Sequence, residues 1–231
     1  MCGRFCVDQN IPIEELKAII EEVDRKLKEM TQTDTEQLKM PLGEIFPTNI
    51  VPAIIGNRLN QTSASPMRWG FSKYSGPGVI INARSETVLE KPMFRLPVLE
   101  RRCLIPATNY YEWGKSVEKI KQESFTDIIL NDSYAHNNVN PTKDNSKKIK
   151  YAIKDPSSQL IYMAGIYRYE ADKQLPVFTI LTRDAAKGIR YIHDRMPVIL
   201  SREAQMAWLS DTTDITGVIS AAIEDVIAEA V

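Results

Sequence analysis

Residues 151–182 decide the fold class, and they read YAIKDPSSQLIYMAGIYRYEADKQLPVFTILT. This stretch holds three runs rich in Ile, Val and Tyr, at Tyr151–Lys154, Leu160–Tyr167 and Val177–Thr182. Short runs of β-branched and aromatic residues are typical of strands. Because the runs follow one another with no βαβ alternation, the sequence predicts an α+β fold with mixed strands and flanking helices.

Working outward from this stretch, we predict more strands and three helices. The further strands are residues 2–7, Ile50–Ile55, Val79–Ile81 and Cys103–Pro106. Residues 11–30 are expected to form an amphipathic helix, with one apolar stripe made by Leu16, Ile19, Ile20, Val23 and Leu27. Ser201 is expected to cap a second helix that runs to Leu209, and Ile215–Ile227 is expected to be a third. We interpret residues 31–49 as a polar loop.

The length of 231 residues allows one large domain or two small ones, and we predict a single domain over residues 1–231. Within it, residues 115–149 differ in composition, because they are rich in Lys, Asn, Asp and Ser. Such a stretch cannot bury much apolar surface. We therefore predict a surface insertion at 115–149.

Composition limits the functional classes. The chain is 43% hydrophobic and 26% charged, with a net charge of −1, which argues against non-specific coating of nucleic acid. It has neither an apolar signal segment nor an apolar run near the ~18 residues that a membrane span needs. Three cysteines form no CxxC motif or disulfide framework, and two histidines make a zinc site improbable. We therefore expect no membrane association, no metal and no cofactor, and a cytoplasmic location.

The first five residues, Met1-Cys2-Gly3-Arg4-Phe5, carry distinctive chemistry. If Met1 is removed, Cys2 presents an amine and a thiol on adjacent carbons. The amine can form an imine with an aldehyde, and the thiol can then close a thiazolidine ring. An α-amino group of pKa ~7.7–8.0 is roughly 10–20% neutral at pH 7, against under ~0.1% for a lysine. The alternative is that Cys2 and Cys6 are simply buried residues of an N-terminal strand.

Four polar islands follow along the chain. Arg68-Trp69 suits a phosphate beside a base or sugar, although a core Trp is the commoner explanation. Asn82 and Arg84 come at the end of an apolar strand. Glu112 alternates with aromatic residues, so that either its pKa is raised for acid–base work or it points to solvent while the aromatics pack. His193 precedes Arg195 in a loop before a strand.

Charge is also uneven along the chain. Residues 66–113 hold seven Lys or Arg against four acidic residues. A local basic surface there would suit phosphate binding, and a solvated face is the alternative.

Taken together, these islands resemble the SOS-response-associated peptidase (SRAP) family, whose members bind abasic sites in single-stranded DNA. The resemblance rests on five motifs in one order: Met1-Cys2-Gly3-Arg4-Phe5, Arg68-Trp69-Gly70, Asn82-Ala83-Arg84-Ser85-Glu86-Thr87, Tyr111-Glu112-Trp113 and His193-Asp194-Arg195-Met196-Pro197. It implies a curved, partly barrel-like, mixed or antiparallel sheet with helices around it. It also implies a monomer that binds single-stranded or junction DNA containing abasic sites and associates with the nucleoid through that DNA.

The resemblance also implies roles for individual residues. Cys2 would be the nucleophile, Asn82 would position its amine, Glu112 would shuttle protons, and His193 would polarise the deoxyribose oxygen. The DNA-binding residues would be Arg4, Arg68, Trp69, Arg84 and Arg195. The loop Gly43-Glu44-Ile45-Phe46 departs from the Arg-Tyr-Asn-type run usual in the family, so the resemblance does not cover that DNA-facing wall.

Three functions remain open at this point. The first is an enzyme that crosslinks itself to abasic sites and shields them. The second is a cysteine peptidase or N-terminal-nucleophile hydrolase that uses Cys2 and His193. The third is a DNA-binding module without catalysis, in which the polar islands only bind phosphate.

Overall fold

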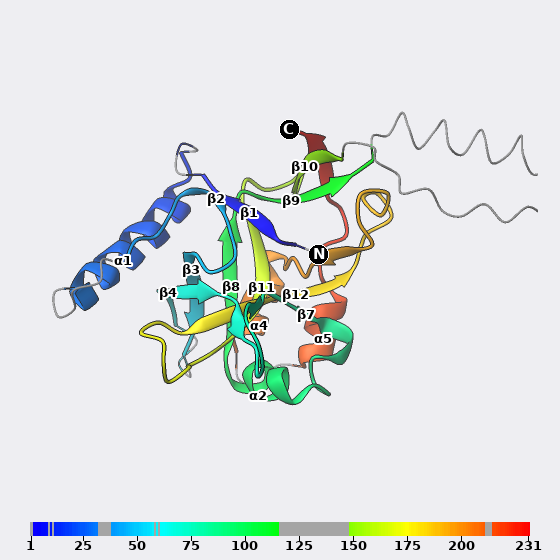
Figure 1. The fold of residues 1–231 in the computed structure, drawn as a ribbon. Coiled ribbons are helices and arrows are strands. Elements are labelled where there is room, and N and C mark those ends of the chain that lie inside the picture. The colour runs from blue at the N-terminus through cyan, green and yellow to red at the C-terminus, as the bar shows by residue number, and fades with distance from the viewer. Residues whose placement is uncertain are drawn as a thin grey trace, which may run out of the picture.

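The computed structural model describes residues 2–8, 10, 12–31, 38–57, 59, 61–115, 148–210 and 214–231. Its centre is a closed ring of five strands (Figure 1). The ring order is β11 (Ile161–Arg168), β8 (Arg102–Ala107), β3 (Ile50–Gly56), β4 (Thr62–Trp69) and β12 (Val177–Asp184), and β12 pairs back onto β11. Closing the ring removes the free edges that an open sheet would expose.

Two short strands extend the ring at β12. β7 (Asn82–Arg84) continues the parallel pairing that β4 begins, and β13 (Arg195–Pro197) pairs antiparallel with the end of β12. The other pairings of the ring are antiparallel. The predicted α+β class with a mixed, partly barrel-like sheet is therefore confirmed.

A second, antiparallel sheet lies above the ring in Figure 1 and has the order β14-β10-β9-β1-β2. Its strands are β14 (Ile227–Ala230), β10 (Ile149–Lys154), β9 (Asn109–Gly114), β1 (Arg4–Val7) and β2 (Gly43–Ile45). Only Thr108 separates β8 of the ring from β9, and its backbone N–H donates to Cys6 of β1. A single residue of chain and this hydrogen bond thus connect the two sheets. β5 (Phe71–Ser72) and β6 (Val79–Ile80) form a separate hairpin.

Helices cover the outside of the ring. They are α1 (Glu14–Thr31), η1 (Ser85–Thr87), α2 (Pro92–Glu100), α4 (Arg202–Leu209) and α5 (Ile215–Ser220). Leu16, Val23 and Leu27 of α1 are buried, as the apolar stripe predicts. The hydroxyl of Ser201 accepts a hydrogen bond from the backbone N–H of Ala204, which confirms the predicted cap of α4.

Two predictions of local structure are wrong. Residues 31–49 are not all loop, because Gly43–Ile45 forms β2 against β1 and buries Ile45. The predicted helix Ile215–Ile227 ends at Ser220, and the chain then forms β14. In both places backbone pairing with a distant strand outweighs the local pattern, which tertiary context often does. The predicted insertion at 115–149 falls mostly outside the described residues.

Arg102 at the start of β8 fixes two helix ends. It is 7% exposed, and its guanidinium donates to the carbonyls of Val98 and Leu99 at the end of α2. It also donates to the carbonyls of Trp208 and Ser210 at the end of α4. These carbonyls have no partner inside their helices, so Arg102 supplies the donors that both helix ends lack.

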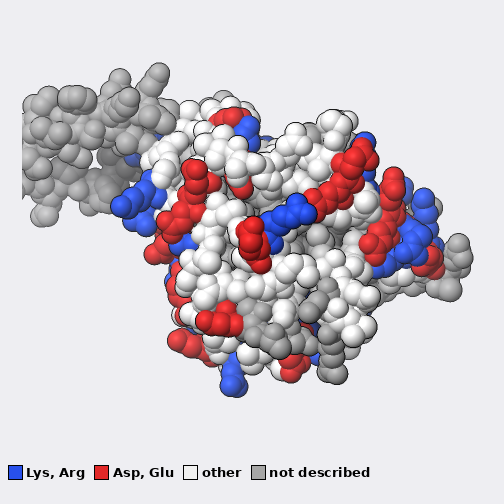
Figure 2. Space-filling view, turned by 180° about the vertical axis from the view of Figure 1, so that it is seen from behind, with Lys and Arg blue, Asp and Glu red and all other residues white. Residues whose placement is uncertain are grey.

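Charged side chains of both signs are mixed on the surface of the described residues. Seen from behind, acidic and basic side chains are interspersed on that face (Figure 2). No helix among the described residues is long and apolar enough to cross a membrane.

Candidate active site

Cys2 lies in the core just before β1 and is fully buried. Its backbone carbonyl accepts a 2.9 Å hydrogen bond from Nδ2 of Asn82, the first residue of β7. Since β7 is fixed by parallel pairing with β12, this bond ties the N-terminal segment to the ring of strands. The structure therefore places two of the predicted catalytic residues in direct contact.

Glu112 reaches the same region from β9 and is 5% exposed. Burial raises the pKa of its carboxyl group. Burial also raises the pKa of the Cys2 thiol, and the negative charge of Glu112 raises it further. The thiol is therefore protonated at neutral pH, beside a carboxyl group that keeps its proton to a higher pH than an ordinary Glu.

Tyr110 is a member of this site that the sequence did not single out. It lies two residues before Glu112, on the same buried face of β9. Burial raises the pKa of its hydroxyl well above the ordinary value, and the charges of Cys2 and Glu112 add to the rise. The alternation of Tyr110 with Glu112 is the signal that could have identified it.

Two buried polar atoms in this region have no hydrogen-bond partner within the described part of the chain. They are Oδ1 of Asn82 and the hydroxyl oxygen of Tyr110. A buried polar group without a partner costs roughly 1–3 kcal/mol, so each one calls for an explanation. A polar ligand that enters beside Cys2 would supply both partners.

His193 lies in the loop before β13 and is partly buried. Its Nδ1 atom accepts a 3.0 Å hydrogen bond from the backbone N–H of Arg195 and lies 2.7 Å from Oδ1 of Asp194. Burial lowers the pKa of His193, more than Asp194 raises it, so the imidazole is neutral at neutral pH. The backbone N–H of Arg195 and the carboxylate of Asp194 both face Nδ1, and together they fix the orientation of the ring.

Gly114 lets the His193 loop approach β9. A Cβ atom at Gly114 would lie 2.7 Å from Cα of Ile192, the residue before His193. Only glycine permits such a close approach of two backbones. Asp194, on the other side of His193, contributes to the raised pKa of Glu112 after the larger effect of burial. The loop and β9 therefore bring His193 and Glu112 to one site.

The predicted DNA-binding role of Arg195 does not fit its environment. Its side chain is 11% exposed and donates two hydrogen bonds to Glu86, at 2.8 and 2.9 Å. It also donates to Asp184 at 2.6 Å and to the carbonyl of Thr182 at 2.7 Å. A guanidinium held by two carboxylates is not available to a phosphate. Arg195, in β13, instead connects η1 to the end of β12.

The predicted DNA-binding role of Trp69 is also wrong. It is fully buried, and its indole N–H donates to the carbonyl of Ile81 at 3.0 Å. Its ring centroid lies 5.0 Å from that of Phe5 and 6.3 Å from that of Phe178. A ring enclosed in this way cannot stack on a nucleobase, so the core alternative holds for Trp69.

The other three predicted DNA-binding residues are accessible. Arg84 is exposed at the end of β7. Arg68 is partly exposed and donates to the carbonyl of Thr48 at 2.9 Å. The side chain of Arg4 is 37% exposed and donates to Glu44 at 3.0 Å. Arg4 and Arg84 lie two residues after Cys2 and Asn82 respectively, so both are close to the site along the chain.

A cavity of about 510 Å³ opens beside Asn82 and Arg84. Its walls include the apolar side chains of Ile80, Met93 and Phe94, together with Lys91. This volume falls in the range of small-molecule sites. The larger cavity of about 840 Å³ is lined by α4 and residues 157–162, and it contains none of the predicted site residues.

The described residues hold no evident metal centre. No group of three or more His, Cys, Asp or Glu side chains among them is close enough together to bind a metal ion. Cys2, Cys6 and Cys103 are all buried with free thiols. The chemistry that this arrangement supports is that of a nucleophile, a carboxyl group and an imidazole.

Comparison with known families adds an independent finding. The SOS response associated peptidase (SRAP) family matches residues 1–229. Abasic site processing protein YoaM of Bacillus subtilis (strain 168) is 32% identical over 224 residues, which cover 91% of this chain and 79% of YoaM. Abasic site processing protein YoqW of Bacillus phage SPbeta is 32% identical over 223 residues, with 91% and 80% covered. For the mouse protein HMCES, also named for abasic site processing, the match is 32% over 160 residues, with 62% and 44% covered.

Solved structures share the fold. A protein from Bacteroides thetaiotaomicron matches with a TM-score of 0.67 at 20% identity, covering 100% of this chain and 92% of that one. A phage-related protein from Bordetella bronchiseptica matches with a TM-score of 0.64 at 21% identity, covering 100% and 94%. At these identities the likeness concerns the fold alone.

Proposed function

Because this chain belongs to the SOS response associated peptidase (SRAP) family, we propose that it processes abasic sites in DNA. We propose further that Cys2, once Met1 has been removed, forms a covalent crosslink with the ring-opened sugar and so shields the lesion. One observation carries this proposal. The backbone of Cys2 is held by Asn82 while its thiol lies near the buried carboxyl group of Glu112.

The chemistry joins an aldehyde to an aminothiol. The α-amine of Cys2 attacks the C1′ aldehyde of the ring-opened deoxyribose and gives a carbinolamine. Loss of one water leaves an imine. The sulfur then adds to the imine carbon, and the thiol proton passes to the nitrogen, which closes the thiazolidine ring. The net change is the formation of one C–N and one C–S bond and the release of one water.

Glu112 and His193 have distinct parts in these steps. Glu112, with its pKa raised by burial, gives a proton to the departing hydroxyl and accepts the proton of the thiol. When the ring reopens, the carboxyl group gives a proton back to the sulfur, and the resulting carboxylate takes a proton from the water that adds to the imine. His193, whose pKa is lowered by burial, forms a hydrogen bond with an oxygen of the sugar. Arg4 and Arg84 bind the phosphates on either side.

The burial of Cys2 affects which form of DNA can bring its sugar to the thiol and amine of this residue. A sugar can reach a fully buried residue only if it leaves the base stack. Extrusion costs a few kcal/mol in a duplex and least in a single strand or at a damaged position. We therefore assign the preference to abasic sites in single-stranded DNA or at its junction with duplex.

The same site is a poor match to a cysteine peptidase. That chemistry needs a thiolate, commonly activated by a neighbouring imidazolium. Here burial raises the pKa of the Cys2 thiol and lowers the pKa of His193, so both groups favour the opposite protonation state. Attack by the amine does not need a thiolate. The pKa directions therefore support aldehyde chemistry over peptide hydrolysis.

Intact-mass spectrometry tests the proposal. The purified protein is measured alone and after incubation with a single-stranded oligonucleotide that carries one abasic site. We expect the protein to lack Met1 and the adduct to equal protein plus oligonucleotide minus one water. Absence of an adduct, or an adduct on chains that keep Met1, would refute it.

Two controls make this test specific. An oligonucleotide whose abasic sugar has been reduced to the alcohol has no aldehyde and should give no adduct. The variant Cys6→Ser removes another buried thiol from the same N-terminal segment and should crosslink like the wild type.

A further inference from the structure

Tyr110 is the member of the site to which the proposed function gives no role. It lies in β9, two residues before Glu112, and its side chain is fully buried. Its neighbours in the sheet are Phe5 of β1 on one side and Ile153 of β10 on the other, and both are buried. These apolar neighbours offer no hydrogen bond to the hydroxyl group of Tyr110, which has no partner among the described residues.

Phenylalanine would pack equally well at this position. Tyr and Phe have the same ring, and a buried hydroxyl group without a hydrogen bond has lost its interactions with water and gained nothing in return. The packing of β9 therefore gives no reason for the hydroxyl group of Tyr110. A reason exists if a molecule that enters the site supplies the missing partner, as it would for Oδ1 of Asn82.

The hydroxyl group of Tyr110 is close to the reacting groups. The charges of Cys2 and Glu112 both act on it, after the larger effect of burial, and raise its pKa. Cys2 is itself fully buried, and an aldehyde carbon that reacts there bonds to its nitrogen and then to its sulfur. A sugar that reaches Cys2 therefore enters the same buried region as the hydroxyl group of Tyr110.

This hydroxyl group is a hydrogen-bond donor that keeps its proton. Because its pKa is raised well above the ordinary value for Tyr, the phenol is neutral at neutral pH. A donor that is fixed in a buried site before the substrate arrives stabilises the charge that develops in the transition state, since it does not have to reorient. Tyr110 thus has the properties of a group that stabilises an oxyanion.

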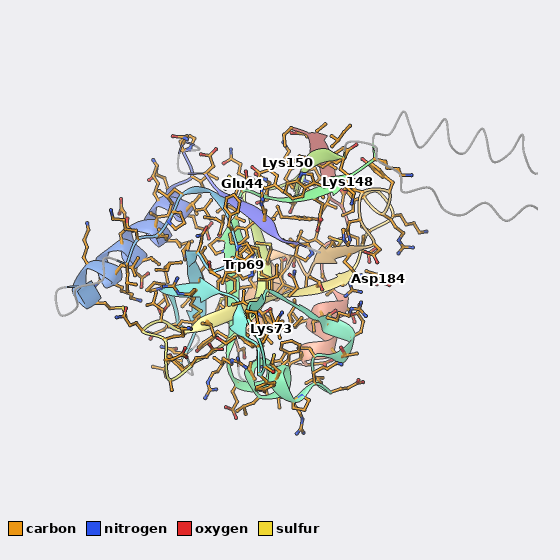
Figure 3. The ribbon with its side chains drawn as sticks, viewed as in Figure 1. Glu44, Trp69, Lys73, Lys148, Lys150 and Asp184 are labelled. Atoms are coloured by element: carbon orange, nitrogen blue, oxygen red, sulfur yellow. The ribbon has the colours of Figure 1, made fainter. Side chains whose placement is uncertain are left out.

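The cationic donors near the site are less suited to a buried oxygen atom. The guanidinium group of Arg195 is held by two carboxylates. Lys150 is paired with Glu44 at 2.7 Å, and Lys148 is exposed. Figure 3 shows Lys150, Glu44 and Lys148 along the upper sheet. Compared with these cations, the hydroxyl group of Tyr110 is both buried and uncommitted.

We infer that Tyr110 is a further catalytic residue, whose hydroxyl group donates a hydrogen bond to the aldehyde oxygen of the ring-opened sugar; this role rests on the proposed function and deepens it. As the α-amine of Cys2 forms the C–N bond at C1′, the π electron pair of the carbonyl group moves onto the oxygen. That oxygen takes up the proton that the nitrogen loses, and Tyr110 keeps its own proton. His193 then binds a second oxygen of the sugar.

Tyr110→Phe tests this role, because it removes the hydroxyl group and leaves the ring. The single-turnover rate of adduct formation at saturating abasic oligonucleotide should fall by about 100- to 1,000-fold, as removal of one oxyanion donor does. Tm should stay the same or rise, since the hydroxyl group has no partner among the described residues. A fall in both rate and Tm would mean that the hydroxyl group supports the structure of the site, and would overturn the inference.

Tyr162→Phe is the matched control. It removes the hydroxyl group of another buried tyrosine, which lies on β11 and lines the larger cavity, away from the predicted site residues. This variant should form the adduct at the wild-type rate. If it were slowed as much as Tyr110→Phe, the effect of Tyr110 would not be specific to the site and the inference would fail.

Affinity separates a role in catalysis from a role in binding. The probe is a single-stranded oligonucleotide whose abasic sugar has been reduced to the alcohol. Tyr110→Phe should bind it no more than about tenfold more weakly than the wild type, because one neutral hydrogen bond is at stake. A loss of affinity as large as the loss of rate would mean that Tyr110 holds the bound sugar and does not stabilise the developing charge.

The Cys2→Ser background identifies the atom on which Tyr110 acts. This variant has no sulfur, and borohydride traps its imine. Adding Tyr110→Phe should slow the trapping by the same factor as it slows the wild type, because the aldehyde oxygen takes part in both reactions. If Tyr110→Phe has no effect in this background, the hydroxyl group acts on the sulfur and the inference is wrong.

The same measurements distinguish this role from the proposed function. If the wild type forms the adduct and Tyr110→Phe forms it at the same rate, only the role of Tyr110 fails. If the wild type forms no adduct with abasic DNA, the proposed function fails, and the role of Tyr110 fails with it.

Discussion

Substitution of Gly114 by Ala is predicted to disturb catalysis through the His193 loop. The new Cβ would lie 2.7 Å from Cα of Ile192, whereas ordinary contact begins at 3.4 Å, so β9 and the loop must separate by about 0.7 Å. Both partners are backbone, which cannot rotate away. A displacement of about 1 Å at a reacting group costs about 100-fold in rate, so we expect a 10- to 100-fold slower crosslink. Overpacking should also cost about 1–3 kcal/mol of stability.

The assay is the single-turnover rate of adduct formation at saturating abasic oligonucleotide, at a temperature below the unfolding range of every variant. Gly188→Ala is the matched control, since a Cβ there meets nothing within 4 Å and the residue lies five positions before His193. It should react like the wild type. If Gly114→Ala also reacts at the wild-type rate while its Tm falls, the approach of the loop to β9 does not set the position of His193 and the reasoning is wrong.

The remaining predictions concern three residues, Glu112, Cys2 and Arg102. Glu112→Gln should slow adduct formation by about 100- to 10,000-fold and remove the loss of rate that the wild type shows as pH rises through the raised pKa of Glu112. Because that pKa is raised in the folded state, the contribution of Glu112 to stability is present at acid pH and is lost as pH rises. Glu112→Gln should therefore raise Tm more at pH 8 than at pH 4. Equal changes in Tm at the two pH values would contradict a raised pKa for Glu112. Cys2→Ser should keep an adduct that borohydride traps, from its free amine, but lose the heat-stable one; a stable adduct without borohydride would exclude the thiazolidine. Arg102→Met should lower the free energy of unfolding in urea by about 2–4 kcal/mol, since the buried carbonyls of Val98 and Trp208 lose their donor. Arg95→Met, a substitution at an exposed position, serves as control. A loss below about 1 kcal/mol would mean that water replaces the guanidinium.

The fold class could be predicted from local patterns, but the closed ring could not. The runs at Leu160–Tyr167 and Val177–Thr182 are strands in the structure because their composition suits a buried sheet. Closure depends on β12 pairing with β4, more than 90 residues earlier in the chain. No local signal encodes such a pairing. β14 illustrates the same limit, because its residues continue a helical pattern yet pair with β10.

Side-chain chemistry was easier to predict than side-chain direction. Asn82 and Glu112 were selected for their residue type and neighbours, and the raised pKa expected for Glu112 agrees with its burial. Trp69 and Arg195 have equally suitable chemistry for DNA, but one is enclosed by aromatic rings and the other by carboxylates. Only the three-dimensional partners separate the two cases. Gly114 was missed because its role depends on a loop almost 80 residues away.

β9 presents different side chains on its two faces. Its buried residues, Tyr110, Glu112 and Gly114, shape the site, and its outer residues, Tyr111 and Trp113, lie under Lys150 and Arg4 on the opposite face. A strand alternates its side chains with a period of two, so a shift of one residue in register would exchange the two sets. β1 and β10 hold the register on both sides, through the pairs Arg4–Tyr111 and Lys150–Trp113. These two pairs belong to longer ladders, so the register of β9 is set by backbone pairing along both neighbouring strands. A slip of one residue would therefore turn Glu112 out of the site and bring Trp113 into it, so the position of the catalytic carboxyl group depends on the pairing of β9 with β1 and β10.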